Sequence, residues 1–206
     1  MSPDDPPANP GWVLASSSRY RAEVLRAAGI QFEAIAPNFD ERSLDGDFET
    51  WGPDRYVIEV ARGKAASVAA TVPPGTIVVA ADQIAVADGR LLTKAGSEER
   101  AIDQLVALSG RTHLLLNGIV VRCAPEGPEA TALDAHRVTM AAFDRAAARS
   151  YVERFLPLDC VGAYRIEDDA GLIASVEGSG DDGVIGLPIA LTLSLIERVK
   201  AAVPQR

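Results

Sequence analysis

The chain has 206 residues, of which 48% are apolar and 24% charged, with a net charge of -9 and a pI of about 4.7. This composition is typical of a globular protein with room for one domain or two small lobes. It argues against a nucleic-acid-binding surface, which needs a basic patch, and no apolar run approaches the roughly 18 residues that span a membrane. A small polyanionic ligand is not excluded, because it needs only a few local cations.

The first ten residues are rich in proline and acid and lack the basic and apolar regions of a signal peptide. We predict a disordered tail over residues 1–10 and a single domain over residues 11–206. The two cysteines, Cys123 and Cys160, show no pairing pattern and fit a reducing cytosol.

A short apolar strand, Trp12–Ala15, runs into three serines at 16–18, and a helix begins at Arg19. Any of the serines can cap the helix, and a strand that feeds a serine-rich loop at a helix N-terminus is suited to anions. Arg19 and Arg21 oppose the helix dipole in the first turn. Either an external anion belongs there, or both arginines point into water.

Alternation predicts a strand over 30–35, followed by a charged loop in which Asp40 and Glu41 are adjacent acids. Adjacent acids in a loop are usually solvated. Residues 43–54 are polar and contain glycine and proline, so we expect an exposed connection, with Pro53 at the first position of the next helix.

Lys64 lies on the apolar stripe of that helix, seven residues after Val57 and three after Ala61. A lysine on the inward side of a helix is unusual. Either it extends along its stem to water, or its ammonium group reaches into a cleft.

An apolar run, 77–81, predicts a buried strand, which the carboxylate of Asp82 interrupts. Because burying an unpaired charge is costly, Asp82 either caps the strand in solvent or is placed there for chemistry. Asp88-Gly89 then indicates a hairpin.

Two hairpin registers are possible. A two-residue loop places Asp82 and Lys94 on opposite faces, whereas a three-residue loop, 87–89, with a bulge at Gly89 pairs them. If both serve one site, the three-residue loop is required, and we predict it.

The rest of the chain alternates helical and extended patterns, with hairpins between them. This indicates an α/β fold with a mixed sheet. Neither a P-loop signature nor a G-x-G-x-x-G fingerprint is present, which argues against P-loop NTPases and dinucleotide-dependent oxidoreductases. The expected helices cover 97–110, 144–155 and the C-terminal segment from Gly186, and the expected strands cover 113–122, 136–140, 161–167 and 173–176.

Two acids and several cations occur at element ends or on inward faces, a combination that suits phosphoryl chemistry. Cations hold phosphates, carboxylates hold a divalent metal, and one carboxylate can take a proton from water. Hard oxygen ligands favour Mg²⁺ or Mn²⁺. The two histidines are too few and too far apart to suggest a histidine metal site. The groups are Ser16 to Arg21, Glu41, Lys64, Asp82 and Lys94.

A set of short segments occurs along the chain in a characteristic order and spacing. They are Leu14-Ala15-Ser16-Ser17-Ser18 with Arg21, Asp40-Glu41, Lys64-Ala65, Ala81-Asp82, Lys94, Leu108-Ser109-Gly110-Arg111 with His113, and Gly186-Leu187-Pro188. In these segments, from about Val13 to Val199, the chain resembles the Maf family, the septum-formation-inhibitor-like nucleoside triphosphate pyrophosphatases. The resemblance implies a two-lobed α/β fold, shared with inosine-triphosphate pyrophosphatases, with a central mixed twisted sheet flanked by helices and a nucleotide cleft between the lobes.

The resemblance also implies an activity, hydrolysis of a nucleoside triphosphate to the monophosphate and pyrophosphate. By position Asp82 resembles the family's proton acceptor and Glu41 its partner in metal binding. A cytoplasmic location, a divalent metal and a homodimer are usual in the family. The positions that resemble phosphate contacts are Ser16, Arg21, Lys64 and Lys94.

Three positions bear on which nucleobase the substrate carries. Family members acting on dTTP and UTP usually carry Arg, Thr and Gln where this chain has Tyr20, Gln83 and Glu167, whereas those similar to 7-methyl-GTP pyrophosphatase carry Trp, Gln and Glu. A methylated guanine is cationic and stacks on an aromatic face, and a carboxylate accepts from its N–H groups. Tyr20 has the alternative of simple packing at the helix start.

The chain departs from the family pattern at Arg19, Ala22 and Ala95. From Tyr20, Gln83 and Glu167 we expect a pyrophosphatase for 7-methyl-GTP or a related modified purine, in the house-cleaning of non-standard nucleotides. The alternatives are the same reaction on dTTP, UTP or modified pyrimidines, and a nucleotide-binding regulator of cell division and septum formation.

Overall fold

A computed structural model describes residues 12–168 and 170–204. The predicted tail, residues 1–10, lies outside the described residues. The chain divides into two compact units. Unit 1 comprises Met1–Asp82, Asn117–Leu133 and Gly186–Arg206, and unit 2 comprises Gln83–Leu116 and Asp134–Ile185. The single domain expected over residues 11–206 stays a prediction.

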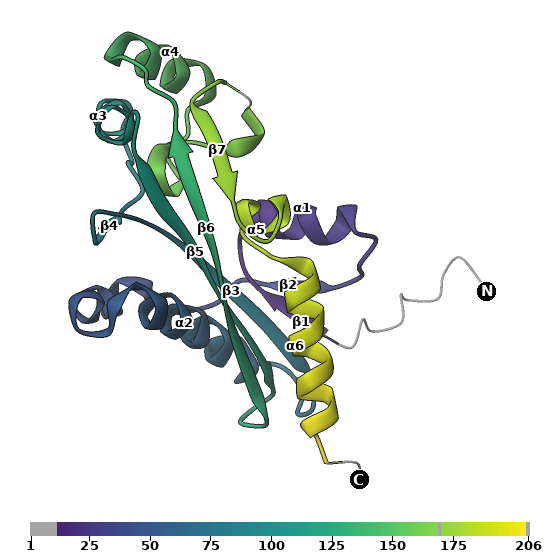
Figure 1. The fold of residues 1–206 in the computed structure, drawn as a ribbon. Coiled ribbons are helices and arrows are strands. Elements are labelled where there is room, and N and C mark those ends of the chain that lie inside the picture. The colour runs from purple at the N-terminus through teal and green to yellow at the C-terminus, as the bar shows by residue number, and fades with distance from the viewer. Residues whose placement is uncertain (1–11, 169, 205–206) are drawn as a thin grey trace. The chain divides into compact units, whose positions relative to one another are not determined.

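The described residues contain a seven-stranded mixed sheet, which confirms the predicted fold class (Figure 1). Its order is β2-β1-β3-β5-β6-β7, with β4 paired to β3. The pairs β1–β2 and β1–β3 are parallel, and β3–β4 and β6–β7 are antiparallel. The strands are β1 Trp12–Ala15, β2 Glu33–Ile35, β3 Ile77–Ala87, β4 Arg90–Leu92, β5 Thr112–Cys123, β6 Glu129–Met140 and β7 Ile173–Glu177.

Helices accompany the strands throughout the chain. The α-helices are α1 Arg19–Ala27, α2 Phe48–Ala69, α3 Glu98–Leu108, α4 Arg145–Phe155, α5 Asp181–Ile185 and α6 Ile189–Ala202, and the 3₁₀ turns are η1 Glu41–Asp47, η2 Val161–Ala163 and η3 Ile166–Asp168.

Unit 1 buries both faces of its part of the sheet, which explains the continuous apolar run in β3. Ile77, Val79 and Ala81 pack into one cluster with residues of α1 and α6, and Val78 and Ala80 pack into another with residues of α2. Successive side chains of a strand point to opposite faces, so helices on both sides require every residue of the run to be apolar. The apolar run ends at Ala81, and Asp82 is the first charged residue of β3.

Unit 2 has a core of its own, in which α3 and α4 lie side by side (Figure 1). The buried face of α3 includes Ile102, Leu105 and Leu108, and that of α4 consists of Ala148, Tyr151 and Val152. Their spacings of three and four residues place these side chains on one face of each helix.

The hairpin register predicted from the sequence is wrong. Val86 pairs directly with Leu91 and Ala87 with Arg90, so the loop has two residues and no bulge. Asp88 and Gly89 have φ values of 50° and 73°. Two positive φ values make a turn whose twist matches the flanking strands, and Asp-Gly is well suited to it.

Two other expectations fail because of local backbone geometry. The predicted strand over residues 161–167 is instead η2 and η3, since Gly162 and Ala163 take positive φ values of 78° and 58° that no strand accepts. The exposed connection expected over 43–54 is helical from Phe48, whose ring is buried against Tyr56. Gly52 interrupts this helix, which resumes at Pro53 as predicted.

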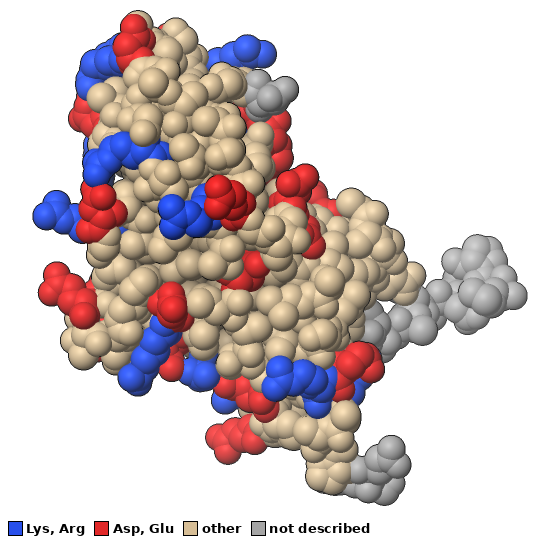
Figure 2. Space-filling view, viewed as in Figure 1, with Lys and Arg blue, Asp and Glu red and all other residues tan. Residues whose placement is uncertain are grey.

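The expected strand over 136–140 is only the second half of β6, because its first half alternates less clearly between apolar and polar residues. On the face shown in Figure 2, acidic and basic side chains are interspersed. No helix among the described residues is both long enough and apolar enough to cross a membrane.

His113 lies in the core of unit 2 beside Tyr164. Its Nε2 is 2.8 Å from the Tyr164 hydroxyl, and the two rings meet edge to face. Burial lowers the pKa of His113 to about 4, because the charged imidazolium would lose its hydration. His113 is therefore neutral in the folded protein at pH 7.

The lowered pKa of His113 predicts a loss of stability in mild acid. The unfolded chain takes up this proton near pH 6.5 and the folded chain only near pH 4, so stability is full above pH 6.5 and falls as the pH drops toward 4. We expect a loss of about 2 kcal/mol between pH 7 and pH 5. Urea unfolding at both pH values measures it.

His113→Gln is the control, because glutamine keeps a polar partner for Tyr164 but does not titrate. Its unfolding free energy should change less over this range than that of the wild type. Equal slopes for the two proteins would contradict the buried, neutral state of His113.

Candidate active site

The serine loop after β1 is built around Arg21. Ser18 caps α1 by accepting from the Arg21 backbone N–H at 3.5 Å, as the sequence predicted. Ser16 Oγ accepts from the backbone N–H of Ser18 at 3.2 Å and from Arg21 Nη1 at 3.4 Å. Arg21 Nε donates to the carbonyl oxygen of Gly186 at 3.0 Å. Arg21 therefore does not point into water, and the serine loop and the start of the C-terminal segment hold its guanidinium group.

The charge of Arg21 is kept in a buried place. Arg21 is only 9% exposed, and burial lowers its pKa, while the carboxylates of Asp82 and Glu41 act in the opposite direction. A guanidinium group stays protonated in any case. Unit 1 thus places a permanent positive charge near two acids at the end of β1.

Lys64 binds both acids of the predicted site. Its Nζ donates to Asp82 Oδ1 at 2.6 Å and lies 2.9 Å from Glu41 Oε1. Lys64 and Asp82 are 6% and 8% exposed, whereas the Glu41 side chain is 52% exposed. The ammonium group thus turns inward rather than extending to solvent. Asp82 is likewise buried and paired, and it is not a strand cap in solvent.

Three elements bring this cluster together for reasons visible in the sequence. The stripe that buries Tyr56 and Val60 also turns Lys64 inward, since these residues follow at intervals of four along α2. Asp82 continues the buried strand β3, whose alternation sets the face on which it lies. Glu41 is the first residue of η1, capped by Asp40, which accepts from the Arg42 backbone N–H at 3.1 Å.

The two carboxylates are arranged to share a cation. Oxygens of Asp82 and Glu41 both lie within hydrogen-bonding distance of one nitrogen atom, at 2.6 and 2.9 Å. Among residues 12–168 and 170–204, no group of three or more His, Cys, Asp or Glu side chains is placed to hold a metal alone. One or two carboxylates completed by phosphate oxygens and water form the usual protein site for Mg²⁺, and these residues fit it.

Tyr20 lies beside the serine loop under a cation of the chain itself. The guanidinium carbon of Arg19 is 4.7 Å from the centre of the Tyr20 ring, and Arg19 Nη2 donates to the Tyr20 hydroxyl at 2.7 Å. The ring is partly exposed and not part of the core. One face of the ring therefore holds a cation of the chain itself, a contact that differs from simple packing in the core.

Gln83 follows Asp82 in β3 and belongs to unit 2. Because side chains alternate along a strand, it leaves β3 on the face opposite to Asp82. Its Nε2 donates to the carbonyl oxygens of Val184 at 2.9 Å and Gly183 at 3.3 Å. Since carbonyl groups only accept, they fix the orientation of the amide and leave its oxygen for another donor.

The other two predicted residues also lie in unit 2, and both are exposed. β4 ends at Leu92, so Lys94 lies beyond the hairpin ladder and the register does not decide its direction. Glu167 lies in η3, which is held by Arg165 Nε donating to Asp168 Oδ1 at 3.1 Å.

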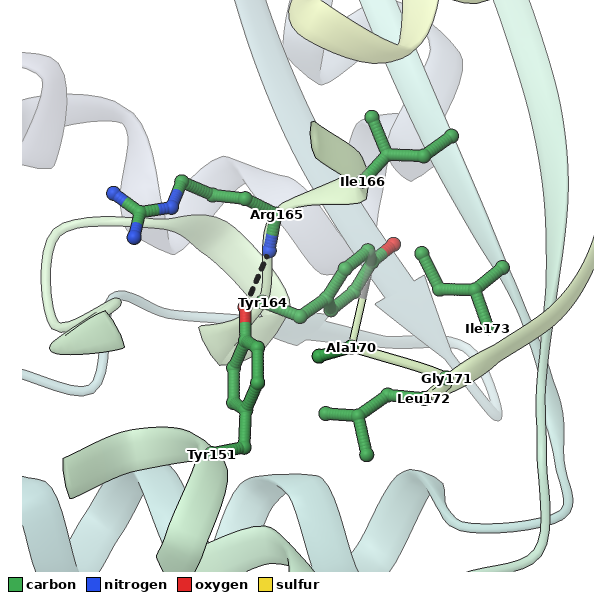
Figure 3. A pocket seen from close by; sticks show the side chains of 8 residues that line it. All are labelled: Tyr151, Tyr164, Arg165, Ile166, Ala170, Gly171, Leu172 and Ile173. Atoms are coloured by element: carbon green, nitrogen blue, oxygen red, sulfur yellow. Dashed lines mark hydrogen bonds between the residues drawn. The ribbon is translucent and has the colours of Figure 1, made fainter. Parts of the chain in front are cut away.

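A hollow of about 200 Å³ adjoins this turn (Figure 3). At the edge of this hollow, the hydroxyl of Tyr151 accepts a hydrogen bond from the Arg165 backbone N–H at 2.9 Å. The side chain of Tyr164 also points toward it. The hollow is lined by Tyr151, Tyr164, Arg165, Ile166, Ala170, Gly171, Leu172 and Ile173.

Sequence reasoning missed a buried polar cluster in unit 2. Asp134 Oδ2 is 2.8 Å from His136 Nε2, and Ser179 Oγ donates to Asp134 Oδ1 at 2.5 Å. The serine contacts the carboxylate and not the imidazole, so this is no nucleophilic triad, in which histidine must contact the serine. An alternating Asp-x-His in β6 was the available signal, but its partner Ser179 is distant in the chain.

The burial of the Lys64–Asp82 pair predicts a measurable loss of unfolding free energy when Lys64 is replaced. Lys64→Met would leave Asp82 buried without its ammonium partner, which typically costs about 3 kcal/mol or more. Urea unfolding should show this loss. Lys200→Met, which removes an exposed pair with Glu197, is the control and should leave stability unchanged. A small effect of Lys64→Met would indicate that Asp82 is in fact well solvated.

Comparison with known proteins agrees with this arrangement. Residues 11–199 match the family model described as Maf-like protein. The chain is 34% identical to a 7-methyl-GTP pyrophosphatase of Nitrosococcus oceani over 93% of this chain and 94% of that protein. It is 38% identical to a dTTP/UTP pyrophosphatase of Methylobacillus flagellatus over the same shares, and 38% identical to one of Anaeromyxobacter dehalogenans over 95% and 97%. The chain therefore belongs to the Maf family.

Proposed function

We propose that this chain hydrolyses the α–β phosphoanhydride bond of a nucleoside triphosphate, giving the monophosphate and pyrophosphate. The observation that carries the proposal is the buried contact of Lys64 with Asp82 and Glu41, near the guanidinium group of Arg21. Family membership supports it, because relatives over nearly the whole chain are named as pyrophosphatases of nucleoside triphosphates.

Asp82 is the proposed proton acceptor. Its Oδ1 is bound by Lys64, and within the part of the chain that the structure describes no hydrogen bond is made to Oδ2. Oδ2 takes a proton from a water molecule, whose oxygen forms a bond to one of the two phosphorus atoms of the α–β phosphoanhydride while the bond from that phosphorus to the bridging oxygen breaks, and the bridging oxygen leaves with the other product. The proposed phosphate contacts are Ser16, Arg21, Lys64 and Lys94.

Glu41 and Asp82 are the proposed ligands of a divalent cation, Mg²⁺ or Mn²⁺. Their oxygens face one point, and phosphate oxygens of the substrate would complete the hard ligand set. Such an ion, when bound, neutralises charge on the phosphates and polarises them. The protein contributes the position of the two carboxylates.

For the nucleobase of the substrate, we propose a preference for 7-methyl-GTP or a related modified purine. Tyr20 offers a ring that already carries a cation, which suits a methylated and therefore cationic guanine. The remaining oxygen of Gln83 and the exposed carboxylate of Glu167 are hydrogen-bond acceptors for N–H groups of a guanine. The alternative substrates are dTTP and UTP, which two relatives at 38% identity carry in their names.

We further propose a cytoplasmic homodimer, on the family resemblance alone. In the absence of any turnover, a nucleotide-binding regulator of cell division and septum formation is the remaining alternative. Sedimentation of the purified chain tests the dimer separately from the activity.

A pyrophosphate-release assay across a nucleotide panel tests the activity and the substrate. We expect turnover, with 7-methyl-GTP ahead of dTTP and UTP. Asp82→Asn should lower kcat by about 100-fold or more, because it removes the proton acceptor. Asp88→Asn is the matched control, since Asp88 is an exposed acid in the turn of the same hairpin and should be close to wild type.

The outcomes of this assay separate the hypotheses. Full activity of Asp82→Asn would remove Asp82 from the proposed role. A clear preference for dTTP and UTP would overturn the substrate choice but not the reaction. Binding of nucleotides with no turnover would favour the regulator.

The metal proposal predicts a dependence on free Mg²⁺. Chelation should abolish turnover, and added Mg²⁺ should restore it. Glu41→Gln should raise the Mg²⁺ concentration needed for half-maximal rate, because it removes one of two charged ligands. Glu49→Gln, at an exposed acid in the first turn of α2, should keep the wild-type requirement. Full activity in excess chelator would contradict the proposal.

A further inference from the structure

Glu41 is the least secured member of the site. Its side chain is 52% exposed, so burial does not hold it, and its contact with Lys64 depends on how the segment around it is attached. The segment consists of residues 39–47, that is Phe39, Asp40 and η1. Both ends of this segment contact α2, the helix that carries Lys64. We propose that Phe39 and Gly63 are positioning residues for Glu41, and that Tyr56 with Asp45 holds the far end of the segment.

The contact between Phe39 and Gly63 is unusually close. A Cβ atom at position 63 would lie 2.3, 2.5 and 2.6 Å from three ring carbons of Phe39, closer than real Cβ contacts come. The ring therefore lies directly on the α2 backbone, at a depth that only glycine permits.

No backbone requirement explains this glycine. Gly63 lies inside α2, and its φ is not among the positive values of the chain. Glycine in the middle of a helix is unfavourable, because it loses more conformational freedom on folding than other residues. The close approach of Phe39 is the structural reason that remains.

The position of this contact connects it to the site. Phe39 comes two residues before Glu41, and Gly63 immediately before Lys64, so the contact lies close to both ends of the Glu41–Lys64 pair. Between them, Asp40 accepts from the Arg42 backbone N–H at 3.1 Å, and Ser43 Oγ donates to the Asp40 carbonyl oxygen at 2.6 Å. Glu41 therefore lies in a hydrogen-bonded turn that starts next to Phe39, and we expect movement of the ring to move the carboxylate.

The far end of the segment is attached by a hydrogen bond. The Tyr56 hydroxyl donates to Asp45 Oδ1 at 2.9 Å, and the Tyr56 ring meets Phe48 edge to face with centres 5.3 Å apart. Burial and the bond to Asp45 raise the pKa of Tyr56, so its hydroxyl stays a donor at neutral pH. Tyr56 and Lys64 are two turns apart on one stripe of α2.

A purely structural role for Phe39 is the alternative. An apolar ring that only covers α2 would affect stability, but not the affinity of the Glu41 site for a cation. The inference rests on the proposed function, because that is where Glu41 receives its role as a ligand. The test therefore needs a measurement of cation binding that does not depend on turnover.

Gly63→Ala is the decisive variant, and Mn²⁺ alone is the probe, with free Mn²⁺ followed by electron paramagnetic resonance. We expect the dissociation constant for Mn²⁺ to rise about tenfold, and the Mg²⁺ concentration for half-maximal turnover to rise in parallel. The rate at saturating Mg²⁺ should stay within about twofold of wild type. Gly46→Ala is the matched control, because a Cβ there meets no atom within 4 Å.

A double variant identifies the route of the effect. If Gly63 acts through Glu41, Gly63→Ala should have no further effect on Mn²⁺ binding in a Glu41→Gln background. Additive effects, or an unchanged Mn²⁺ affinity in Gly63→Ala, would overturn the proposal. Phe39→Leu replaces the ring by a smaller side chain without adding an atom to α2, and it should give the same shift in Mn²⁺ affinity. It takes the place of Gly63→Ala if that variant does not fold.

Failure of the proposed function would look different. A wild-type protein that binds Mn²⁺ but turns over no nucleotide would reject the pyrophosphatase, while the comparison of variants would still decide the role of Gly63. A wild-type protein that does not bind Mn²⁺ through Glu41 would overturn the positioning proposal itself.

Discussion

A buried ammonium group needs a carboxylate within reach, and the structure of unit 1 depends on how Lys64 meets this requirement. Removing an ion from water costs several kcal/mol, and only close partners recover that energy. Lys64 has Asp82 at 2.6 Å and Glu41 at 2.9 Å. α2, β3 and η1 therefore meet at Lys64, and displacing the part of β3 that carries Asp82 would leave the buried ammonium group with only the exposed Glu41 as a partner.

The second buried cation, Arg21, is held differently. Its partners are the hydroxyl of Ser16 and the carbonyl oxygen of Gly186, which are neutral groups, and the two acids act on it only through space. A guanidinium group held by neutral acceptors keeps more of its charge available to an anion than one in a tight ion pair. The two cations thus differ in their partners, since Lys64 contacts two carboxylates and Arg21 contacts a hydroxyl group and a carbonyl group.

Much of this arrangement was predictable from local patterns. The run from Ile77 to Ala81 indicated a strand buried on both faces, and the stripe of α2 placed Lys64 on the inward side of its helix, although it left open whether the ammonium group turns inward or extends to water. The serine cap of α1 also followed from the sequence. These features are set by periodicity and by caps, which act over a few residues.

The failures concern features that local patterns do not determine. The hairpin register depended on a presumed pairing of Asp82 with Lys94, but β4 ends at Leu92, so no ladder reaches Lys94. A two-residue turn with positive φ at Asp88 and Gly89 satisfies the twist of both strands without a bulge. The contact of Ser179 with Asp134 is equally hidden, because it joins residues 45 positions apart.

The charges of the cluster show why a divalent ion belongs in the proposal. Asp82 and Glu41 carry two negative charges and Lys64 and Arg21 carry two positive charges, so the four groups sum to zero and offer a polyphosphate little net attraction. An ammonium group has three N–H donors, and the two carboxylates occupy two of them, which leaves one for a phosphate oxygen. A divalent ion on the carboxylates would leave an excess of two positive charges where a triphosphate needs them. The exposed Glu41 is the ligand that can adjust to such an ion, and its attachment to α2 limits how far it moves.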